Sequence, residues 1–191
     1  MKIRDSGMPD EPSWERFFDA RQVLRQLGLT HGHAEVVDFG CGYGTFSIAA
    51  AGMTTGTIYA LDIDPNMVAA TAARARQLGL SNVRAIERDV VANGAGLPPG
   101  SVDYAMLFNI LHAEDVAGLL GEALGVLRPG GTLGIIHWIH DARTPRGPPL
   151  SIRPRPEQCV QWAAAAGFEL SGASIELPPY HYGLVARKPL P

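Results

Sequence analysis

Three glycines at alternate positions are the clearest candidate for chemistry in this sequence. They lie in the segment Asp38-Phe39-Gly40-Cys41-Gly42-Tyr43-Gly44, directly after a short apolar stretch. Glycine lets the chain turn sharply and lets a ligand approach bare backbone, where amide N–H groups and the start of the next helix act as donors. A dinucleotide-binding fingerprint would place its third glycine at position 45, where Thr45 stands. The spacing predicts a ligand-binding loop of another kind, the alternative being a tight turn without a ligand.

Acidic residues stand near the ends of three predicted strands, where they would face that loop. Asp62 follows the first glycine by 22 residues, and its carboxylate can accept hydrogen bonds from both hydroxyls of a ribose. Asp38 would orient the loop or bind an amine, and Asp89 would accept an adenine amino group. The structural alternative is a solvated or capping carboxylate, the role we expect for Asp64, which precedes a proline at a helix start. The pattern favours a nucleoside ligand.

Histidines near the ends of the predicted fourth and fifth strands are candidates for a general base. A histidine titrates near neutral pH and can therefore take a proton from a hydroxyl or an amine. His112 is the first choice and His140 the second, with Asp141 as a candidate orienting group. For each of them, and for His137, a solvated or structurally hydrogen-bonded ring remains the alternative.

Aromatic and basic side chains predict where an acceptor would bind. Five aromatic residues are candidates for the wall of an aromatic or apolar pocket, although core packing explains the same pattern: Trp14, Phe18, Trp138, Tyr180 and Tyr182. The segment 141–156 contains five prolines, which favour a functional loop over regular structure. Arg143, Arg146, Arg153 and Arg155 occupy its 142–156 portion, which has no acidic residue. They favour an anionic acceptor bound by Arg143 and Arg146, or simply keep the loop soluble.

Strand and helix patterns alternate along most of the chain. Strands are expected at 35–39, 57–62, 82–87, 102–108, 132–139, 169–177 and 180–188, and helices at 46–51, 65–79, 116–127 and 156–166. A first helix over 13–28, capped by Ser13, would lie over the ligand cleft after a polar segment, 1–12. We therefore predict one α/β domain over 1–191. Its fold would be Rossmann-like and doubly wound, with a seven-stranded sheet, mostly parallel, that closes with a C-terminal antiparallel strand pair.

The composition and charge of the chain limit the kinds of partner that we expect it to bind. The 191 residues are 46% hydrophobic with a net charge of −3, which provides no global field for nucleic acid or an anionic membrane. Two cysteines far apart favour a reducing cytoplasm, and no apolar run approaches the length of a membrane span. We expect a monomer or homodimer, without a metal site, that acts on a small molecule.

Taken together, the ordered motifs resemble those of class I S-adenosylmethionine (SAM) dependent methyltransferases. The resemblance covers roughly 34–188 and is nearest to the small, single-domain, quinone-biosynthesis-like group that acts on small molecules. It is carried by residues 36–45, 60–64, 102–112 and 127–133, together with Asp89. It implies that SAM is the methyl donor and S-adenosylhomocysteine the product. The implied cofactor contacts are Gly40, Cys41, Gly42, Tyr43, Gly44 and Asn109 for the methionine part, Asp62 for the ribose, and Ile63, Asp89 and Val90 for the adenine.

The same motifs disfavour several neighbouring functions. Methylases of base amines carry two prolines and an aromatic residue after the fourth strand, where this chain has Asn109-Ile110-Leu111-His112. Arsenic methylases need more thiols than the two present. A nicotinamide-dependent oxidoreductase conflicts with the glycine spacing, whereas a SAM-binding sensor or scaffold without turnover remains an alternative.

Overall fold

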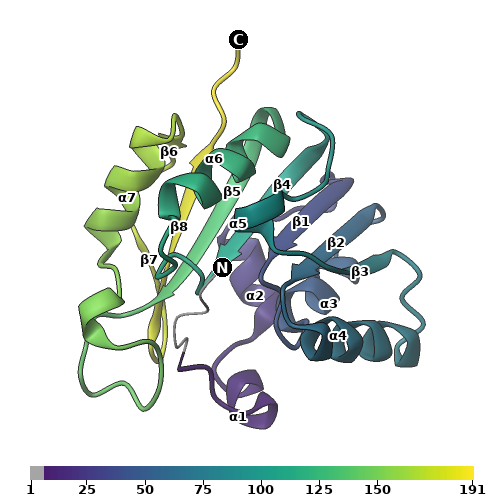
Figure 1. Ribbon diagram of the computed structural model, residues 1–191, viewed down its shortest axis with the longest axis horizontal. Coiled ribbons are helices and arrows are strands. Elements are labelled where there is room, and N and C mark those ends of the chain that lie inside the picture. The colour runs from purple at the N-terminus through teal and green to yellow at the C-terminus, as the bar shows by residue number, and fades with distance from the viewer. Residues whose placement is uncertain (1–6) are drawn as a thin grey trace.

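The sheet of this protein has the strand order β3-β2-β1-β4-β5-β8-β6, with β7 also paired to β8 (Figure 1). A computed structural model describes residues 7–191, so half of the expected polar segment 1–12 lies outside the described residues. The strands are β1 (Glu35–Phe39), β2 (Thr57–Asp62), β3 (Val83–Glu87), β4 (Val102–Phe108), β5 (Leu127–Trp138), β6 (Glu169–Leu170), β7 (Ile175–Leu177) and β8 (His181–Arg187). The strands β1 to β5 pair in parallel, whereas β8 runs antiparallel to β5, β6 and β7. The predicted α/β class with its antiparallel C-terminal strands is confirmed.

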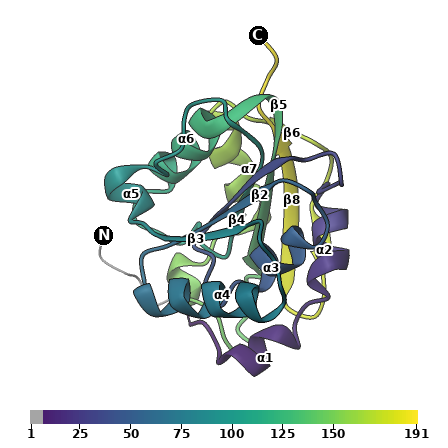
Figure 2. The ribbon, with the colours of Figure 1, turned by 90° about the vertical axis from the view of Figure 1, so that its right-hand side faces the viewer.

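Helices cover both faces of the sheet (Figure 2). They are α1 (Glu11–Glu15), α2 (Ala20–Gln26), α3 (Thr45–Ala51), α4 (Pro65–Gln77), α5 (Val90–Asn93), α6 (Val116–Val126) and α7 (Pro156–Ala165). Residues of α1, α2 and α3 pack into one hydrophobic core, and residues of α5, α6 and α7 pack into the other. The sheet therefore separates two cores, as expected for a doubly wound fold.

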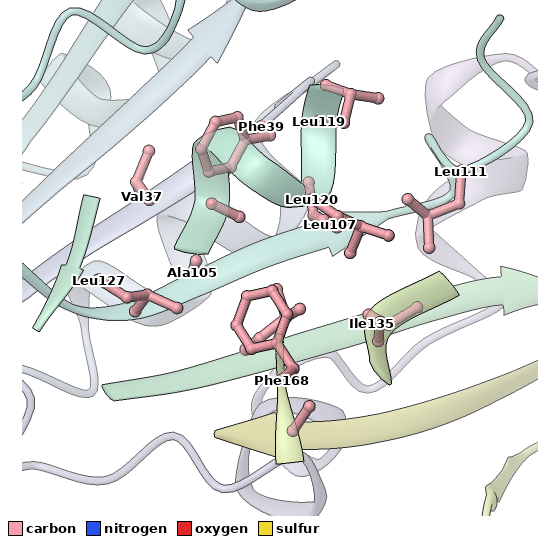
Figure 3. Packing of buried hydrophobic residues seen from close by; sticks show 14 of the residues in the cluster. Val37, Phe39, Ala105, Leu107, Leu111, Leu119, Leu120, Leu127, Ile135 and Phe168 are labelled. Carbon is pink, nitrogen blue, oxygen red and sulfur yellow. The ribbon is translucent and has the colours of Figure 1, made fainter. Parts of the chain in front are cut away.

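Alternation along the central strands supplies both cores. Phe39 and Leu107 point toward Leu119 and Leu120 of α6, all four without solvent exposure (Figure 3). Neighbouring strand residues such as Met106 face the opposite core. Because both faces are covered, β4 is apolar at every position except Asp103, which is typical of a central parallel strand.

The N-terminal region differs from the prediction of one helix over 13–28 capped by Ser13. Asp10 caps α1, and its Oδ1 accepts a hydrogen bond from the Ser13 amide at 3.0 Å. Asp19 caps α2 in the same way, by accepting from the Gln22 amide at 3.0 Å. Two acidic caps nine residues apart start two short helices, so the prediction of a single helix and of Ser13 as its cap was wrong.

Three other elements depart from the sequence pattern. The strand β5 continues through the predicted break at 128–131, because a register shift opposite Val102 absorbs the extra residues. The predicted strand 169–177 divides into β6 and β7, which pair with successive parts of β8. The helix α5 was not predicted. The 141–156 segment, in contrast, is irregular apart from a single 3₁₀ turn at Leu150–Ile152. Within residues 7–191, no helix has the length and apolar character required to cross a bilayer.

Candidate active site

A cleft of about 370 Å³ opens at the carboxyl ends of β1, β2 and β4, where this type of fold binds ligands. We call it the glycine-loop cleft. Most of the predicted cofactor residues line it, namely Asp38, Gly40, Cys41, Gly42, Tyr43, Asp62, Ile63, Asp89, Val90 and Asn109. Gly44 does not line the cleft and begins α3 instead. Residues that sequence reasoning missed also line it, among them Met8, Phe46, Met67, Arg88, Phe108 and Ile110. Phe108 and Ile110 belong to the 102–112 motif but were not singled out within it, whereas Met8, Phe46, Met67 and Arg88 lie outside the motifs, so the sequence contained no signal for these four.

The glycine loop has a backbone that only glycine adopts easily. Gly42 and Gly44 have φ angles of +53° and +79°, in the left-handed region. A Cβ atom on Gly44 would lie 2.6 Å from Thr71 Oγ1, so α4 packs directly against the loop. Asp62 holds the loop from the other side, since its Oδ2 accepts from the Gly42 amide at 2.8 Å and its Oδ1 from the Asp64 amide at 2.9 Å. The loop is thus preformed by its own backbone and by the end of β2.

Asp38 is a buried acid at the base of the cleft, with 2% of its surface exposed. Burial raises the pKa of its carboxyl to about 7, although a hydrogen bond from Ser47 Oγ to Oδ2 at 2.6 Å opposes the shift. The negative charge of Asp62 raises the pKa of Asp38 further. Asp38 therefore gains or loses its proton near neutral pH, and a cationic ligand group beside it would favour the charged carboxylate.

Asn109 ends β4 in a strained conformation. Its φ is +56°, and within the described residues both its Oδ1 and its Nδ2 are buried without a hydrogen-bond partner. Leaving a buried amide unpaired costs about 1–3 kcal/mol per group, so such a pair usually marks a ligand contact. Because Asn109 lines the cleft, its amide is available to a polar ligand group.

At the other end of the cleft, Asp89 acts as a helix cap. Its Oδ1 accepts from the amides of Ala92 at 3.0 Å and Val91 at 3.2 Å, and the Ala92 amide in particular lowers the pKa of the Asp89 carboxyl. Apolar side chains of Ile63 and Val90 lie beside it in the lining. This end combines an anion with apolar walls, which suits an aromatic base that bears an amino group.

The N-terminal segment covers the cleft. Met8 and Trp14 line it, and the Trp14 ring lies edge-on to Phe18 and tilted against Trp138, with centroid separations of 5.0 Å and 6.1 Å. Arg74 of α4 ties α1 down through ion pairs with Glu11 and Glu15. Trp14 of α1 therefore lies at the cleft.

Of the five predicted aromatic wall residues, only Trp14 and Trp138 line the cleft. Phe18 is enclosed among other rings, including His181 at 4.5 Å, and Tyr180 stacks on Trp138 at 6.4 Å. Tyr182 lies on the other face of the sheet, where its hydroxyl donates to the carbonyl of Pro154 at 3.1 Å. Phe18 and Tyr180 thus pack against Trp14 and Trp138 outside the cleft lining, whereas Tyr182 belongs to the other core.

The histidines occupy different surroundings. His112 is buried in the wall of the cleft, and its ring lies 5.6 Å from that of His137. His137 is fully buried, and burial lowers its pKa to about 3, which keeps its ring neutral. His140 lies outside the cleft lining, with Nδ1 2.8 Å from the carbonyl oxygen of Arg153. The structure brings His112, and not His140, to the cleft.

The arginine-rich loop contradicts part of the sequence interpretation. The Asp141 carboxylate binds the Arg143 guanidinium through both oxygens, so Asp141 does not orient His140 and Arg143 has an acidic partner. Arg153 is 6% exposed and donates to backbone carbonyls across 139–148, among them those of Pro148 and Ile139. Of the four arginines of 142–156, Arg153 is buried and Arg143 is paired with Asp141, so the four do not act together as available cations. Neither Arg143 nor Arg146 lines the cleft.

A second cavity of about 950 Å³ lies between α6, α7 and the 150–154 segment, and we call it the α6–α7 cavity. His112 and Ala113 line both this cavity and the glycine-loop cleft. His140 lines the α6–α7 cavity alone. Sequence reasoning did not predict the cavity, because no motif marks the two helices that form it. Among residues 7–191, no group of three or more histidine, cysteine or acidic side chains has the geometry of a metal site.

Known proteins share this architecture. Residues 36–131 match the family model described as a methyltransferase domain. The fold superposes on a SAM-dependent methyltransferase from Aquifex aeolicus with a TM-score of 0.83 and 29% identity, covering 93% of this chain and 94% of that one.

Curated relatives match over shorter segments. A ribosomal protein L11 methyltransferase of Methylococcus capsulatus is 39% identical over 100 residues, 52% of this chain and 32% of the relative. A demethylmenaquinone methyltransferase of Tropheryma whipplei is 29% identical over 124 residues, 64% of this chain and 49% of the relative. The matches thus span about a third to a half of the relatives' length.

The cleft fits the cofactor of this family. Bare glycine backbone, a carboxylate at the end of β2 and the unpaired Asn109 amide provide contacts for its amino-acid and ribose parts, and the apolar walls suit its base. The strand order, the glycine loop at the end of β1 and the family match together show that this chain belongs to the class I SAM-dependent methyltransferases.

Proposed function

We propose that this protein transfers the methyl group of SAM to a small-molecule acceptor. The observation that carries the proposal is the cover over the glycine-loop cleft, where Met8 and Trp14 of the N-terminal segment lie against Trp138 and the glycine loop. Such a cover leaves room for a small acceptor but obstructs a folded macromolecule that would have to present a side chain in the cleft. This favours the small-molecule group over methylation of a protein.

The cofactor contacts follow from the position and chemistry of each lining residue. Asp62 would accept hydrogen bonds from the ribose hydroxyls through the lone pairs that its two backbone donors leave available. Asn109 would bind the methionine end, with Asp38 as the counter-charge for the amine. Ile63 and Val90 would pack on the adenine, with Asp89 at its amino edge.

Bound SAM supplies a methyl group on a positively charged sulfur. The protein's main contribution is to hold the acceptor in line with that group and to exclude water, which Trp14 and Trp138 do from above the cleft. A lone pair of the acceptor's hydroxyl oxygen forms the new bond to the methyl carbon while the carbon–sulfur bond breaks with its electrons to sulfur. We propose that His112 takes the hydroxyl proton, because it is the histidine in the cleft wall.

The relatives' names point to two kinds of acceptor, a ribosomal protein and a demethylmenaquinone. The second is a quinone and not a protein, which agrees with the covered cleft and with the resemblance to the quinone-biosynthesis-like group. We therefore place this protein's acceptor with the second kind.

The test is transfer of tritium from methyl-labelled SAM. Purified protein is offered a pool of uncharged phenols and alcohols in one arm and a desalted cell-protein fraction in the other. We expect label in the organic extract of the first arm and none in precipitated protein of the second. Label in protein alone would overturn the small-molecule proposal, and label in neither arm with intact SAM binding would favour a non-catalytic SAM binder.

The role of His112 is tested with a matched pair of variants. His112→Gln should lower kcat by roughly 10²–10⁴ with little change in SAM affinity, which is the usual contribution of a general base. His31→Gln is the control, because His31 is exposed and lines neither the glycine-loop cleft nor the α6–α7 cavity. Equal kcat values for the two variants would remove His112 from the chemistry.

A further inference from the structure

We propose that the α6–α7 cavity binds the body of the methyl acceptor, and that it selects an uncharged, largely apolar molecule whose nucleophilic end reaches the glycine-loop cleft at His112. This inference rests on the proposed small-molecule methyl transfer and adds the location and the chemical class of the acceptor.

The two cavities meet at one short segment of chain. After β4, Asn109 and Ile110 line the glycine-loop cleft, Leu111 lines the α6–α7 cavity, and His112 and Ala113 line both. The segment is therefore the wall that the two spaces share. A molecule in the α6–α7 cavity that extends to this wall meets the proposed proton acceptor and the cofactor's cleft at the same place. No other residues are common to the two linings as the structure describes them.

The lining of the α6–α7 cavity is mainly apolar. Its apolar members come from three segments, namely Leu111, Ala113, Val116 and Ala117; Leu150, Ile152 and Pro154; and Trp162, Ala165 and Ala166. Trp162 is half-buried, so part of its indole remains available to a ligand. A volume of about 950 Å³, lined by an aromatic side chain and by more apolar than polar residues, is typical of a site for a sizeable small molecule.

The charges around the cavity argue against an anionic ligand. Arg153 is the one arginine or lysine in the described lining, and its guanidinium already donates to the Pro148 and Ile139 carbonyls and to Thr144 Oγ1. Asp115 stands at the exposed edge and would repel an anion. Because the part of the lining that the structure describes offers no available cation, a carboxylate or sulfonate would lose its hydration there without gaining an ion pair, so this lining favours an uncharged molecule.

The wall formed by the 150–154 segment is held in place before any ligand binds. The bonds of Arg153 fix the segment to 139–148, and the Tyr182 hydroxyl donates to the Pro154 carbonyl at 3.1 Å. A preformed apolar pocket binds with less loss of conformational entropy than one that must close around its ligand. The buried arginine thus shapes the acceptor site instead of contacting the acceptor.

The experiment uses two fluorescent probes that differ in one charged group. N-phenyl-1-naphthylamine is uncharged, and 1-anilinonaphthalene-8-sulfonate adds a sulfonate to the same ring system. Both are titrated into protein saturated with S-adenosylhomocysteine, so that the glycine-loop cleft is filled. We expect the neutral probe to bind at least about tenfold more tightly than the sulfonate, a difference that corresponds to about 1.4 kcal/mol. Equal or tighter binding of the sulfonate would overturn the assignment of an uncharged ligand.

A matched pair of variants locates the probe. Ala165 and Ala164 are adjacent exposed residues of α7, but only Ala165 lines the cavity. Ala165→Trp should weaken the neutral probe at least about tenfold, and Ala164→Trp should leave it within about twofold of wild type. Calorimetry with S-adenosylhomocysteine should give the same affinity for wild type and both variants. Equal probe affinity in the two variants would show that the probe, and by inference the acceptor, binds elsewhere.

Activity separates this inference from the function on which it rests. With an acceptor found in the tritium assay, Ala165→Trp should raise KM at least about tenfold and change kcat little, whereas Ala164→Trp should change neither. If small acceptors are methylated with equal KM in both variants, the cavity assignment fails and the proposed function stands. If only proteins are methylated, the proposed function itself fails.

Discussion

The glycine-loop cleft presents backbone amides and carboxylates at fixed spacings, whereas most of the side chains that line the α6–α7 cavity lie outside any motif. In the cleft, Gly42 donates its amide to Asp62, and both belong to a recognisable pattern. In the cavity, Leu150 and Trp162 come from the 150–154 segment and from α7, neither of which contains a recognisable motif. Backbone recognition constrains the sequence tightly, while an apolar pocket tolerates many residues of similar size. The cofactor is therefore far easier to read from this chain than the acceptor.

The largest loss of cofactor affinity is expected from a change to the backbone of the glycine loop. Gly42→Val places a branched side chain at a φ of +53° and beside Met8 Cε, where a Cβ alone would lie at 2.9 Å. We expect binding of S-adenosylhomocysteine to weaken by more than about 100-fold, or ~2.7 kcal/mol, with an almost unchanged circular dichroism spectrum.

Gly79→Val is the control for that substitution. Gly79 has a similar φ of +66° at the end of α4, and a Cβ there meets nothing within 4 Å. It therefore introduces backbone strain without reaching the cleft. Equal affinity of the two valine variants for the cofactor product would mean that the glycine loop is merely a structural turn.

A smaller loss is expected from the carboxylate that meets the loop. Asp62→Ala removes the acceptor of the Gly42 amide and the proposed ribose contact together. Losing hydrogen bonds to a charged group costs roughly 1.5–3 kcal/mol, which corresponds to roughly 10–150-fold in affinity. Asp62→Asn keeps one oxygen acceptor and should fall between wild type and the alanine variant. Calorimetry that gave all three proteins the same affinity would contradict the ribose assignment.

The sequence predicted those parts of the molecule that depend on local rules. The strands β1, β2 and β4 have the predicted bounds, and Asp64 caps α4 as expected, because buried runs and caps act over a few neighbouring residues. The N-terminal helix was misread because two acidic caps, Asp10 and Asp19, compete with one apolar stripe. Which rings contact one another depends on how distant elements pack, and spacing does not reveal it.

The same limit applies to charge. Four arginines in a loop without acidic residues resembled a cationic rim, but the acid Asp141 lies one position before that stretch and binds Arg143. Arg153 is buried because the loop folds back around it and presents several carbonyls to one guanidinium. Nothing in the order of residues distinguishes a structural arginine from a ligand-binding one.

Asp38, the buried acid of the cleft, should affect the stability of the protein in a way that depends on pH, which no apolar residue of the α6–α7 cavity can do. The pKa of Asp38 is raised to about 7, well above its ordinary range, so the folded state holds an extra proton between about pH 4 and 7. In that window the contribution of Asp38 to the free energy of unfolding falls as pH rises, because the unfolded chain releases the proton first. Each pKa unit corresponds to about 1.4 kcal/mol, which sets an upper limit of about 4 kcal/mol.

Asp38→Asn keeps the shape and can still accept from Ser47, but it cannot ionise. Urea unfolding should therefore give similar stabilities for the two proteins near pH 4.5 and a more stable variant at pH 8. A stability difference that is independent of pH would show that Asp38 is not an acid with a raised pKa in the folded protein.

The smallest effect is expected at the cover over the cleft. Arg74 pairs with Glu11 and Glu15 of α1, and the three side chains are 31%, 43% and 40% exposed, so each pair should contribute only about 0–1 kcal/mol. Arg74→Gln should loosen α1 and lower the affinity for S-adenosylhomocysteine no more than about fivefold, an effect that should vanish in 1 M salt because the Debye length is then about 3 Å. Arg76→Gln is the control, since it removes the same charge from α4 and has no ion pair with α1 among the described residues. If Arg74→Gln had no effect at low salt, α1 would be held by the packing of Trp14 alone. The cover over the cleft would then depend on apolar contacts, like the lining of the α6–α7 cavity, and not on charge.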